Sequence, residues 1–147
     1  MKSTPDIQAK ILLIDDSRNG LLVRTALLED MGCQVEIASN GEEGLKIFQS
    51  DHFDVVVTDY RMPGMNGLEL IGRIRQIEPH ARIVLLSKMA EPLGLNEENT
   101  GADAVIAKSF NEVSQLPRAV RRLLNRPVRK PLASQRLIGS KAGVAAR

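Results

Sequence analysis

The feature that most constrains the fold is the stretch at residues 54–68, which reads DVVVTDYRMPGMNGL. Its first half is a short run of β-branched apolar residues that ends in a carboxylate, Asp59, and its second half is rich in Gly, Pro and Asn. This pattern predicts a buried strand followed by a turn. A carboxylate at the end of an apolar strand is costly, because burial disfavours its ionised form. Asp59 therefore needs a partner or a chemical task.

Other apolar runs recur along the chain, each separated from the next by a segment of helix length. We predict strands at residues 10–15 (KILLID), 33–38 (CQVEIA), 54–59, 81–87 (ARIVLLS) and 101–108 (GADAVIAK). The continuous runs at 10–15, 54–59 and 81–87 are typical of strands buried on both faces, whereas the alternating run at 33–38 is typical of an outer strand. Strands that alternate with helices predict an α/β fold with a parallel sheet.

Apolar residues at helical spacing predict the first three helices between these strands. The first ends at Gly32, after the polar corner at residues 16–19 that offers several caps, and carries Leu21, Leu22, Ala26, Leu27 and Met31. The second begins at residues 40–41 and runs through Leu45 and Phe48. The third ends before Pro79 and carries Leu68, Leu70, Ile71, Ile74 and Ile77.

The last two helices contain prolines that limit them. Pro92 and Gly94 predict a short or irregular fourth helix between residues 88 and 100. Because Pro117 is tolerated in the first turn of a helix, we expect the fifth to begin near Gln115, with Ser114 as a candidate cap. Its apolar stripe comprises Leu116, Val120, Leu123 and Leu124, and its other face Arg118, Arg121, Arg122 and Arg126.

The net charge of +2 conceals an asymmetry between the two ends of the chain. Residues 1–108 hold 11 Lys+Arg and 17 Asp+Glu, whereas residues 109–147 hold 9 Lys+Arg and only Glu112, which is −6 against +8. The last segment has too few large apolar residues for a second core. We therefore predict one domain at residues 8–126 and a basic, flexible tail at residues 127–147, which would make any contact with a polyanion.

Composition also bounds the compartment. No apolar run is long enough to cross a membrane, and the first ten residues lack the apolar segment of a secretory signal, so we expect a cytoplasmic protein without membrane contact. The single cysteine, Cys33, cannot form an internal disulfide, and its apolar neighbours Val35 and Ile37 favour a place in the core.

Side chains that carry chemistry fall at the carboxyl ends of the predicted strands, where open parallel sheets collect functional groups. They are Asp15, Asp16, Asp59, Ser87 and Lys108. Two carboxylates about 4 Å apart repel by roughly 1 kcal/mol in water and about 4 kcal/mol at an effective dielectric constant near 20. A divalent cation relieves this repulsion, and clustered hard oxygen ligands suit Mg²⁺.

Each of these residues also has an ordinary explanation when taken alone. The acidic pair could cap the first helix, Asp59 could cap the turn that follows it, Ser87 could simply end a strand, and Lys108 could lie in solvent. Their coincidence at one edge of the sheet favours a site for a metal ion and a phosphoryl group.

The chain resembles the receiver domain of bacterial two-component response regulators. The resemblance covers roughly residues 8–126 and lies in ILLIDDS, NGEEGL, VVVTDYRMPGMNGLEL, IVLLS and GADAVIAKSF, in that order and spacing. It implies a (βα)5 flavodoxin-like domain, a doubly wound parallel five-stranded sheet with strand order 2-1-3-4-5.

The resemblance also implies roles for the site residues. Asp59 would be the phosphoacceptor, Ser87 would bond the phosphoryl group, and Lys108 would pair with it. Mg²⁺ would be held directly by Asp16 and Asp59, largely through water by Asp15, and by the backbone carbonyl of Arg61. Asp59 would then attack phosphorus in line, displacing a phosphohistidine or a small donor.

The partners implied are a histidine kinase or phosphotransfer protein upstream and a protein target downstream. Phosphorylation would draw Ser87 and Lys108 inward and bias the face formed by the fourth strand, fourth helix and fifth strand. The resemblance also allows a homodimer through the fourth helix, fifth strand and fifth helix. The tail is too short for a helix-turn-helix domain, so we do not expect direct DNA binding by this chain.

Four departures from the family pattern surround this site. Ser109 stands where the family usually has Pro after a cis bond, so we expect either a trans peptide with a shifted loop or a strained cis bond. Lys88 stands where Ala or Gly is usual, and with Arg61 it adds charge and bulk that could hold phosphate longer or obstruct a donor. Val105 replaces an aromatic whose rotamer often reports phosphorylation, and Pro92 and Gly94 weaken the fourth helix.

Two alternatives remain open beside a phosphorylatable signalling switch that is not a turnover enzyme. One is an atypical receiver that acts by protein contact without phosphorylation, since the departures cluster around the site. The other is a Mg²⁺-dependent phosphohydrolase with an aspartyl nucleophile. That class needs a second acid two residues after the nucleophile, and Ser17 and Arg61 occupy those positions.

Overall fold

The computed structural model describes residues 8–88, 93–109 and 111–126, and within them the chain alternates strand and helix. The expected tail at residues 127–147 and Pro92 lie outside the described residues. The elements are β1 (Lys10–Ile14), α1 (Arg18–Asp30), β2 (Gln34–Ala38), α2 (Gly41–Ser50), β3 (Val55–Asp59), α3 (Gly67–Ile77), β4 (Ile83–Ser87), α4 (Glu97–Thr100), β5 (Ala104–Ala107) and α5 (Glu112–Asn125).

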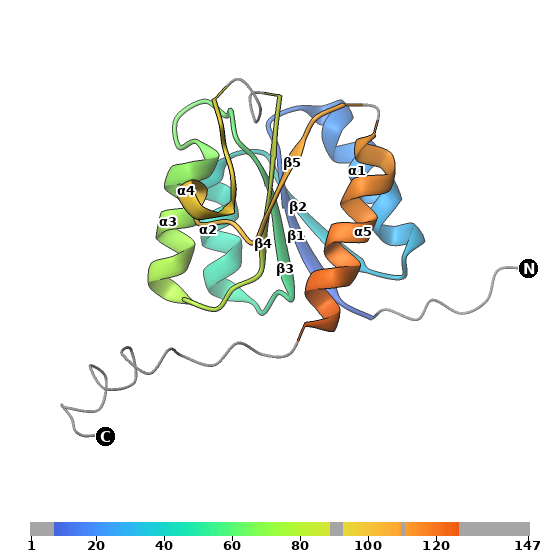
Figure 1. The fold of residues 1–147 in the computed structure, drawn as a ribbon. Coiled ribbons are helices and arrows are strands. Elements are labelled where there is room, and N and C mark those ends of the chain that lie inside the picture. Colours follow the sequence, from blue (N-terminus) through green and yellow to red (C-terminus); the bar gives the residue numbers. More distant parts are fainter. Residues whose placement is uncertain (1–7, 89–92, 110, 127–147) are drawn as a thin grey trace, which may run out of the picture.

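The five strands form one parallel sheet in the order β2-β1-β3-β4-β5, which confirms the predicted flavodoxin-like topology. Helices α1 and α5 cover one face, and α2, α3 and α4 cover the other (Figure 1). Strands β1, β3 and β4 are buried almost throughout, whereas β2 lies at one edge and is mostly exposed, as its alternating sequence predicts.

Alternate residues of the central strands feed two separate cores. Ile11 and Leu13 of β1 pack on the side of α1 and α5, where Cys33 is also buried, while Leu12 and Ile14 pack on the side of α2 and α3. Side chains that point to opposite faces in turn explain why these strands are apolar at every position.

Helix starts follow the polar residues that precede them. The side chains of Ser17, Asn40 and Asn66 each accept a hydrogen bond from a backbone N–H in the first turn of α1, α2 and α3. Such caps satisfy donors that the helix itself leaves unpaired. The cap of α1 is Ser17 and not the acidic pair Asp15 and Asp16 that precedes it.

The predicted apolar face of α1 is confirmed for Leu21 and Met31, which are buried, but not for Leu22 and Ala26. Leu22 is 65% exposed and Ala26 is also exposed, while Leu21, Arg24 and Leu28 are buried. Arg24 occupies an inward position between Leu21 and Leu28, where an apolar stripe would place another apolar residue. The reason lies in the site described below.

The predicted start of α5 is also wrong. The helix begins at Glu112 with Asn111 before it, so Pro117 lies inside the helix and Ser114 is not its cap. Proline removes only its own backbone donor, so one missing bond and a local distortion are the cost. The buried contacts of Leu116, Val120 and Leu123 offset that cost.

The other helix predictions are confirmed in the main. Helix α4 has only four residues, and Gly94 before it has φ +64°. On α5, Arg118, Arg121 and Arg122 are exposed as expected, but Arg126 turns toward the sheet. No helix among the described residues is long and apolar enough to span a membrane.

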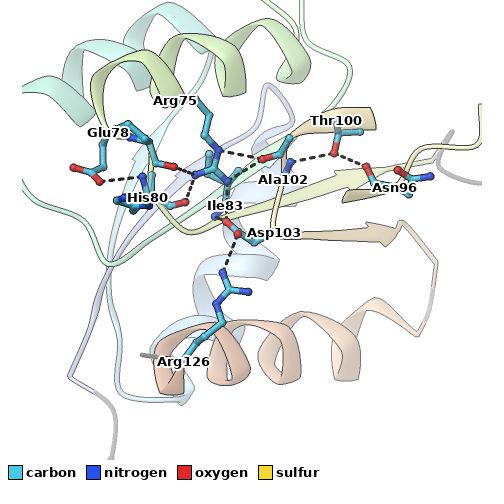
Figure 2. A network of polar contacts seen from close by, with 12 residues as sticks. Arg75, Glu78, His80, Ile83, Asn96, Thr100, Ala102, Asp103 and Arg126 are labelled. Carbon is cyan, nitrogen blue, oxygen red and sulfur yellow. Dashed lines mark hydrogen bonds and ion pairs between the residues drawn. The ribbon is translucent and has the colours of Figure 1, made fainter. Parts of the chain in front are cut away.

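A polar network ties the amino ends of β4 and β5 to α3 and α5 (Figure 2). Asp103 accepts hydrogen bonds from Arg75, from Arg126 and from the backbone N–H of Ile83, at 2.9, 2.8 and 2.8 Å. Arg75 also donates to the carbonyls of Pro79, Ala81 and Gly101. The end of the sheet opposite the predicted site is therefore closed by charge-assisted bonds.

Candidate functional site

Three carboxylates meet at the carboxyl ends of β1 and β3. Ile14 pairs with Thr58 in the parallel ladder, so Asp15 and Asp59 follow side by side. Carboxylate oxygens of Asp15, Asp16 and Asp59 all lie within 4.8 Å of one another. Asp15 and Asp59 are buried and Asp16 is exposed, so the cluster opens to solvent on one side. This set of hard oxygen donors fits Mg²⁺, which keeps several of its waters.

Lys108 reaches the same cluster from the residue after β5. Its ammonium group lies 2.7 Å from Oδ1 of Asp59, and 14% of its side chain is exposed. Burial raises the pKa of the Asp59 carboxyl above its ordinary range, the charge of Asp15 adds to that rise, and the hydrogen bond and charge of Lys108 oppose it. Lys108 is therefore a partner of Asp59 and not a solvated charge.

Ser87 completes the group from β4. Asp59 pairs with Leu86 in the ladder, and Ser87 is the buried residue that follows. The carbonyl of Ser87 accepts the backbone N–H of Lys108 at 2.9 Å, which holds the ends of β4 and β5 together. A pocket above these strands is lined by Asp16, Ser17, Asp59, Arg61, Ser87, Lys88 and Lys108. Every predicted site residue except the buried Asp15 lines it.

The loop after Asp59 owes its shape to its glycines. Gly64 has φ +76°, a backbone conformation that glycine adopts without strain. A Cβ on Gly67 would lie 2.4 Å from the backbone oxygen of Asp59, so only glycine lets α3 begin this close to the end of β3. Arg61, in the same loop, is exposed beside the pocket.

The sequence analysis missed a second cation at the cluster. Arg24, in the middle of α1, is buried, and its Nη1 donates to Oδ2 of Asp15. The other oxygen of Asp15 accepts the backbone N–H of Ser17 at 2.9 Å. Both oxygens of Asp15 are thus engaged within the protein, and Asp15 needs no solvent to satisfy its charge.

Arg24 is itself held by an acid from the far end of the sequence. Its Nε and Nη2 donate to the two carboxylate oxygens of Glu112, the first residue of α5. Burial alone would lower the pKa of Arg24, but its hydrogen bond to Glu112 and the charges of Glu112, Asp15 and Asp59 raise it. The signal available in the sequence was a charged residue at helical spacing from Leu21 and Leu28, both of which are buried.

The structure shows the positions of Ser109 and Lys88, two of the departures from the family pattern. The described residues contain no cis peptide bond, so the Lys108–Ser109 bond is trans and the expected strained cis bond is absent. The Ser109 hydroxyl accepts the backbone N–H of Asn111 at 3.2 Å and so begins the turn into α5. Lys88 and Arg61 are both exposed at the pocket and add positive charge at its entrance.

Comparison with known families identifies this arrangement. The family model of the response regulator receiver domain matches residues 11–121, a range that holds all the acids of the cluster together with Ser87 and Lys108. The chain belongs to the response regulator receiver domain family. Such domains are signalling switches, and in this one the acidic cluster lies where the family is phosphorylated.

Individual relatives of this receiver domain show the same relationship. Over 117 residues the chain is 34% identical to the gliding motility regulatory protein of Myxococcus xanthus, a match that covers 78% of this chain and 15% of that protein. The chain thus spans a small part of this curated relative.

Solved structures agree in fold over the whole length of their chains. The response regulator protein TrrA of Thermotoga maritima, in complex with Mg²⁺ and BeF, is 36% identical with a TM-score of 0.72, and the match covers 79% of this chain and 99% of that one. A structure of the same response regulator in complex with the histidine kinase ThkA also matches, with a TM-score of 0.72, 36% identity and coverage of 80% and 99%.

Proposed function

We propose that this receiver domain accepts a phosphoryl group on Asp59 from a histidine kinase or phosphotransfer protein, in a Mg²⁺-dependent reaction, and thereby switches its contacts with a protein target. The observation that carries the proposal is the position of Asp59. Its buried carboxylate lies beside the other acids of the cluster and beside Lys108, and Asp59 lines the pocket.

The residues would divide the work as follows. A carboxylate oxygen of Asp59 attacks phosphorus as the bond from phosphorus to the donor atom breaks, which yields an acyl phosphate. Lys108 neutralises charge on the transferred group, and the Ser87 hydroxyl donates a hydrogen bond to it. Lys108 must leave its ion pair with Asp59 to do so, since that carboxylate is consumed.

The metal would be bound by Asp15, Asp16 and Asp59, with the backbone carbonyl of Arg61 as a further ligand. When bound, Mg²⁺ supplies a positive charge that offsets repulsion between the carboxylates and the phosphoryl oxygens. The donor set supports this assignment, because oxygens from all three acids already lie within 4.8 Å of one another.

The partners follow from the same role. The complex of TrrA with ThkA supports a histidine kinase as the upstream partner. The output would pass through the face of β4, α4 and β5, or through a homodimer formed by α4, β5 and α5. We expect this switch to transfer and lose its own phosphoryl group without turning over external substrates.

Incubation with acetyl phosphate and Mg²⁺ tests the proposal. Intact-mass spectrometry should show one added phosphoryl group on the wild-type chain, none on Asp59→Asn, and none when the metal is chelated. Asp51→Asn, which changes an exposed acid far from the site, should accept the group like the wild type. No added mass from acetyl phosphate or from a cognate kinase would overturn the proposal.

A receiver that works without phosphorylation is the second candidate. Two observations favour it: Lys88 and Arg61 stand at the entrance of the pocket, and Arg24 already occupies Asp15. The same experiment separates the two, because this alternative requires that neither the wild-type chain nor Asp59→Asn gains a phosphoryl group.

A further inference from the structure

Arg24 and Glu112 are buried charges that the proposed phosphoryl transfer does not use. Glu112 begins α5, Arg24 lies midway along α1, and Asp15 belongs to the acidic cluster. The Arg24 side chain is 9% exposed and that of Glu112 is 12% exposed. Removing such groups from water is costly, and here the cost is offset by ion pairs that run from the cluster through Arg24 to α5.

Both ends of the guanidinium group are engaged. Nη1 of Arg24 donates to Oδ2 of Asp15. On the other side of the group, Nε donates to Oε2 of Glu112, and Nη2 donates to Oε1 of Glu112 at 3.3 Å. The contact with Glu112 is the two-pronged arrangement in which arginine binds a carboxylate most strongly. The two acids therefore share one cation.

Gly20 makes the contact with Asp15 possible. It lies one turn before Arg24 on α1, and a Cβ at this position would stand 2.4 Å from Nη1 of Arg24 and 2.4 Å from Oδ2 of Asp15. Glycine inside a helix is less favourable than alanine. Here the absence of a side chain leaves the space through which Arg24 reaches the acid.

The electrostatic consequence concerns the metal. Lys108 places a positive charge against Asp59, and Arg24 places one against Asp15 that it shares with Glu112. Moving Arg24 off Asp15 would leave the charge of that carboxylate available to a divalent cation. Repulsion between like charges at this range is strong where solvent is excluded.

We infer that Arg24 is a positioning residue that opposes divalent-cation binding at the acidic cluster by holding Asp15, and that Glu112 on α5 limits this opposition by drawing Arg24 away. The inference rests on the proposed Mg²⁺-dependent receiver function. Because coupling between two sites is reciprocal, Mg²⁺ binding then also acts on the contact between Arg24 and the first turn of α5.

Mg²⁺ titration of the full chain by calorimetry tests the inference with three variants. Gly20→Ala places a Cβ where Nη1 of Arg24 and Oδ2 of Asp15 meet, so it separates the pair without changing any charge. Arg24→Met combined with Glu112→Gln removes the cation and its acid together, so that neither is left buried alone. Glu112→Gln by itself leaves Arg24 entirely to Asp15.

The first two variants should bind Mg²⁺ about tenfold more tightly than the wild type, which corresponds to about 1.4 kcal/mol. Glu112→Gln should bind it more weakly. Adding Gly20→Ala to the Arg24→Met/Glu112→Gln chain should tighten binding no further, because no guanidinium remains to be displaced. Damage to the fold would weaken binding, so tighter binding is an outcome that a purely structural role does not give.

Circular dichroism checks that each variant is folded, and the Arg24→Met/Glu112→Gln chain carries the test if Gly20→Ala does not fold. Unchanged or weaker Mg²⁺ binding by that folded double variant would overturn the inference. If the wild type binds no Mg²⁺, both the inference and the proposed function fail. If the affinities shift as expected while no variant accepts a phosphoryl group from acetyl phosphate, the inference stands and the proposed function fails.

Discussion

At the scale of single residues, the site could be predicted where strand ends determine it. Asp15, Asp59, Ser87 and Lys108 follow apolar runs, and a parallel sheet brings the ends of such runs to one edge. Arg24 could not be predicted in the same way, because its acid partner Glu112 lies 88 residues away and a lone arginine in a helix usually faces solvent.

The burial of Asp59 predicts that the site costs stability. Its pKa is raised by desolvation, so ionising the carboxyl at neutral pH costs more free energy in the folded protein than in the unfolded chain. Replacing Asp59 by Asn removes that charge and should raise the free energy of unfolding at pH 7, by on the order of 1 kcal/mol.

The pH dependence of the stability difference between the wild type and Asp59→Asn provides a second test. The penalty on the wild type disappears as the pH falls through the raised folded pKa of Asp59, so the advantage of Asp59→Asn should shrink on acidification. Urea unfolding at several pH values measures the difference, and Asp16→Asn is the control that removes the exposed acid of the cluster. An Asp59→Asn chain less stable than the wild type at pH 7 would contradict this account.

At the scale of elements, apolar periodicity locates strands and helices better than it locates their ends. The start of α5 was misplaced because the cost of Pro117 inside a helix is a local quantity, and the burial of Leu116, Val120 and Leu123 outweighs it. The face of α1 was predicted only in part, because the arginine of an ion pair, which no apolar pattern records, occupies an inward position.

The junction of α3, β4, β5 and α5 provides the prediction at this scale. Asp103→Ala leaves Arg75 and Arg126 without their carboxylate and the N–H of Ile83 without its acceptor, and should cost roughly 3 kcal/mol of stability. Asp51→Ala, which breaks the exposed pair with Lys10 and the exposed hydrogen bond from the backbone N–H of His52, should cost less than about 1 kcal/mol.

Lowering the pH should remove the contribution of Asp103 to the free energy of unfolding. Burial alone would raise the pKa of this carboxyl, but the hydrogen bonds from Ile83, Arg126 and Arg75 outweigh burial and hold it below its ordinary range. The contribution is therefore complete above the unfolded pKa, which is about 3.9, and is lost as the pH falls through the lower folded value. Urea unfolding of wild type and Asp103→Asn at falling pH should show converging stabilities; a gap that widens would contradict the network.

At the scale of the whole molecule, the two ends of the sheet have different tasks. The amino ends of β4 and β5 are closed by the arginine pairs on Asp103, while the carboxyl ends hold an open acidic cluster with two internal cations. The topology and the site edge were predictable from the order of apolar runs and the family motifs. The ion pairs that join the cluster to α5 through Arg24 of α1 depend on tertiary packing alone, so the sequence pattern did not predict them.

The central claim, that Asp59 accepts the phosphoryl group, is tested most directly by trapping. After reaction with acetyl phosphate and Mg²⁺, borohydride reduces an acyl phosphate to an alcohol, which converts a phosphorylated aspartate into homoserine. Peptide mass spectrometry should then find homoserine at position 59 and unchanged aspartate at positions 15 and 16. Homoserine at either of those positions, or at none, would contradict the account.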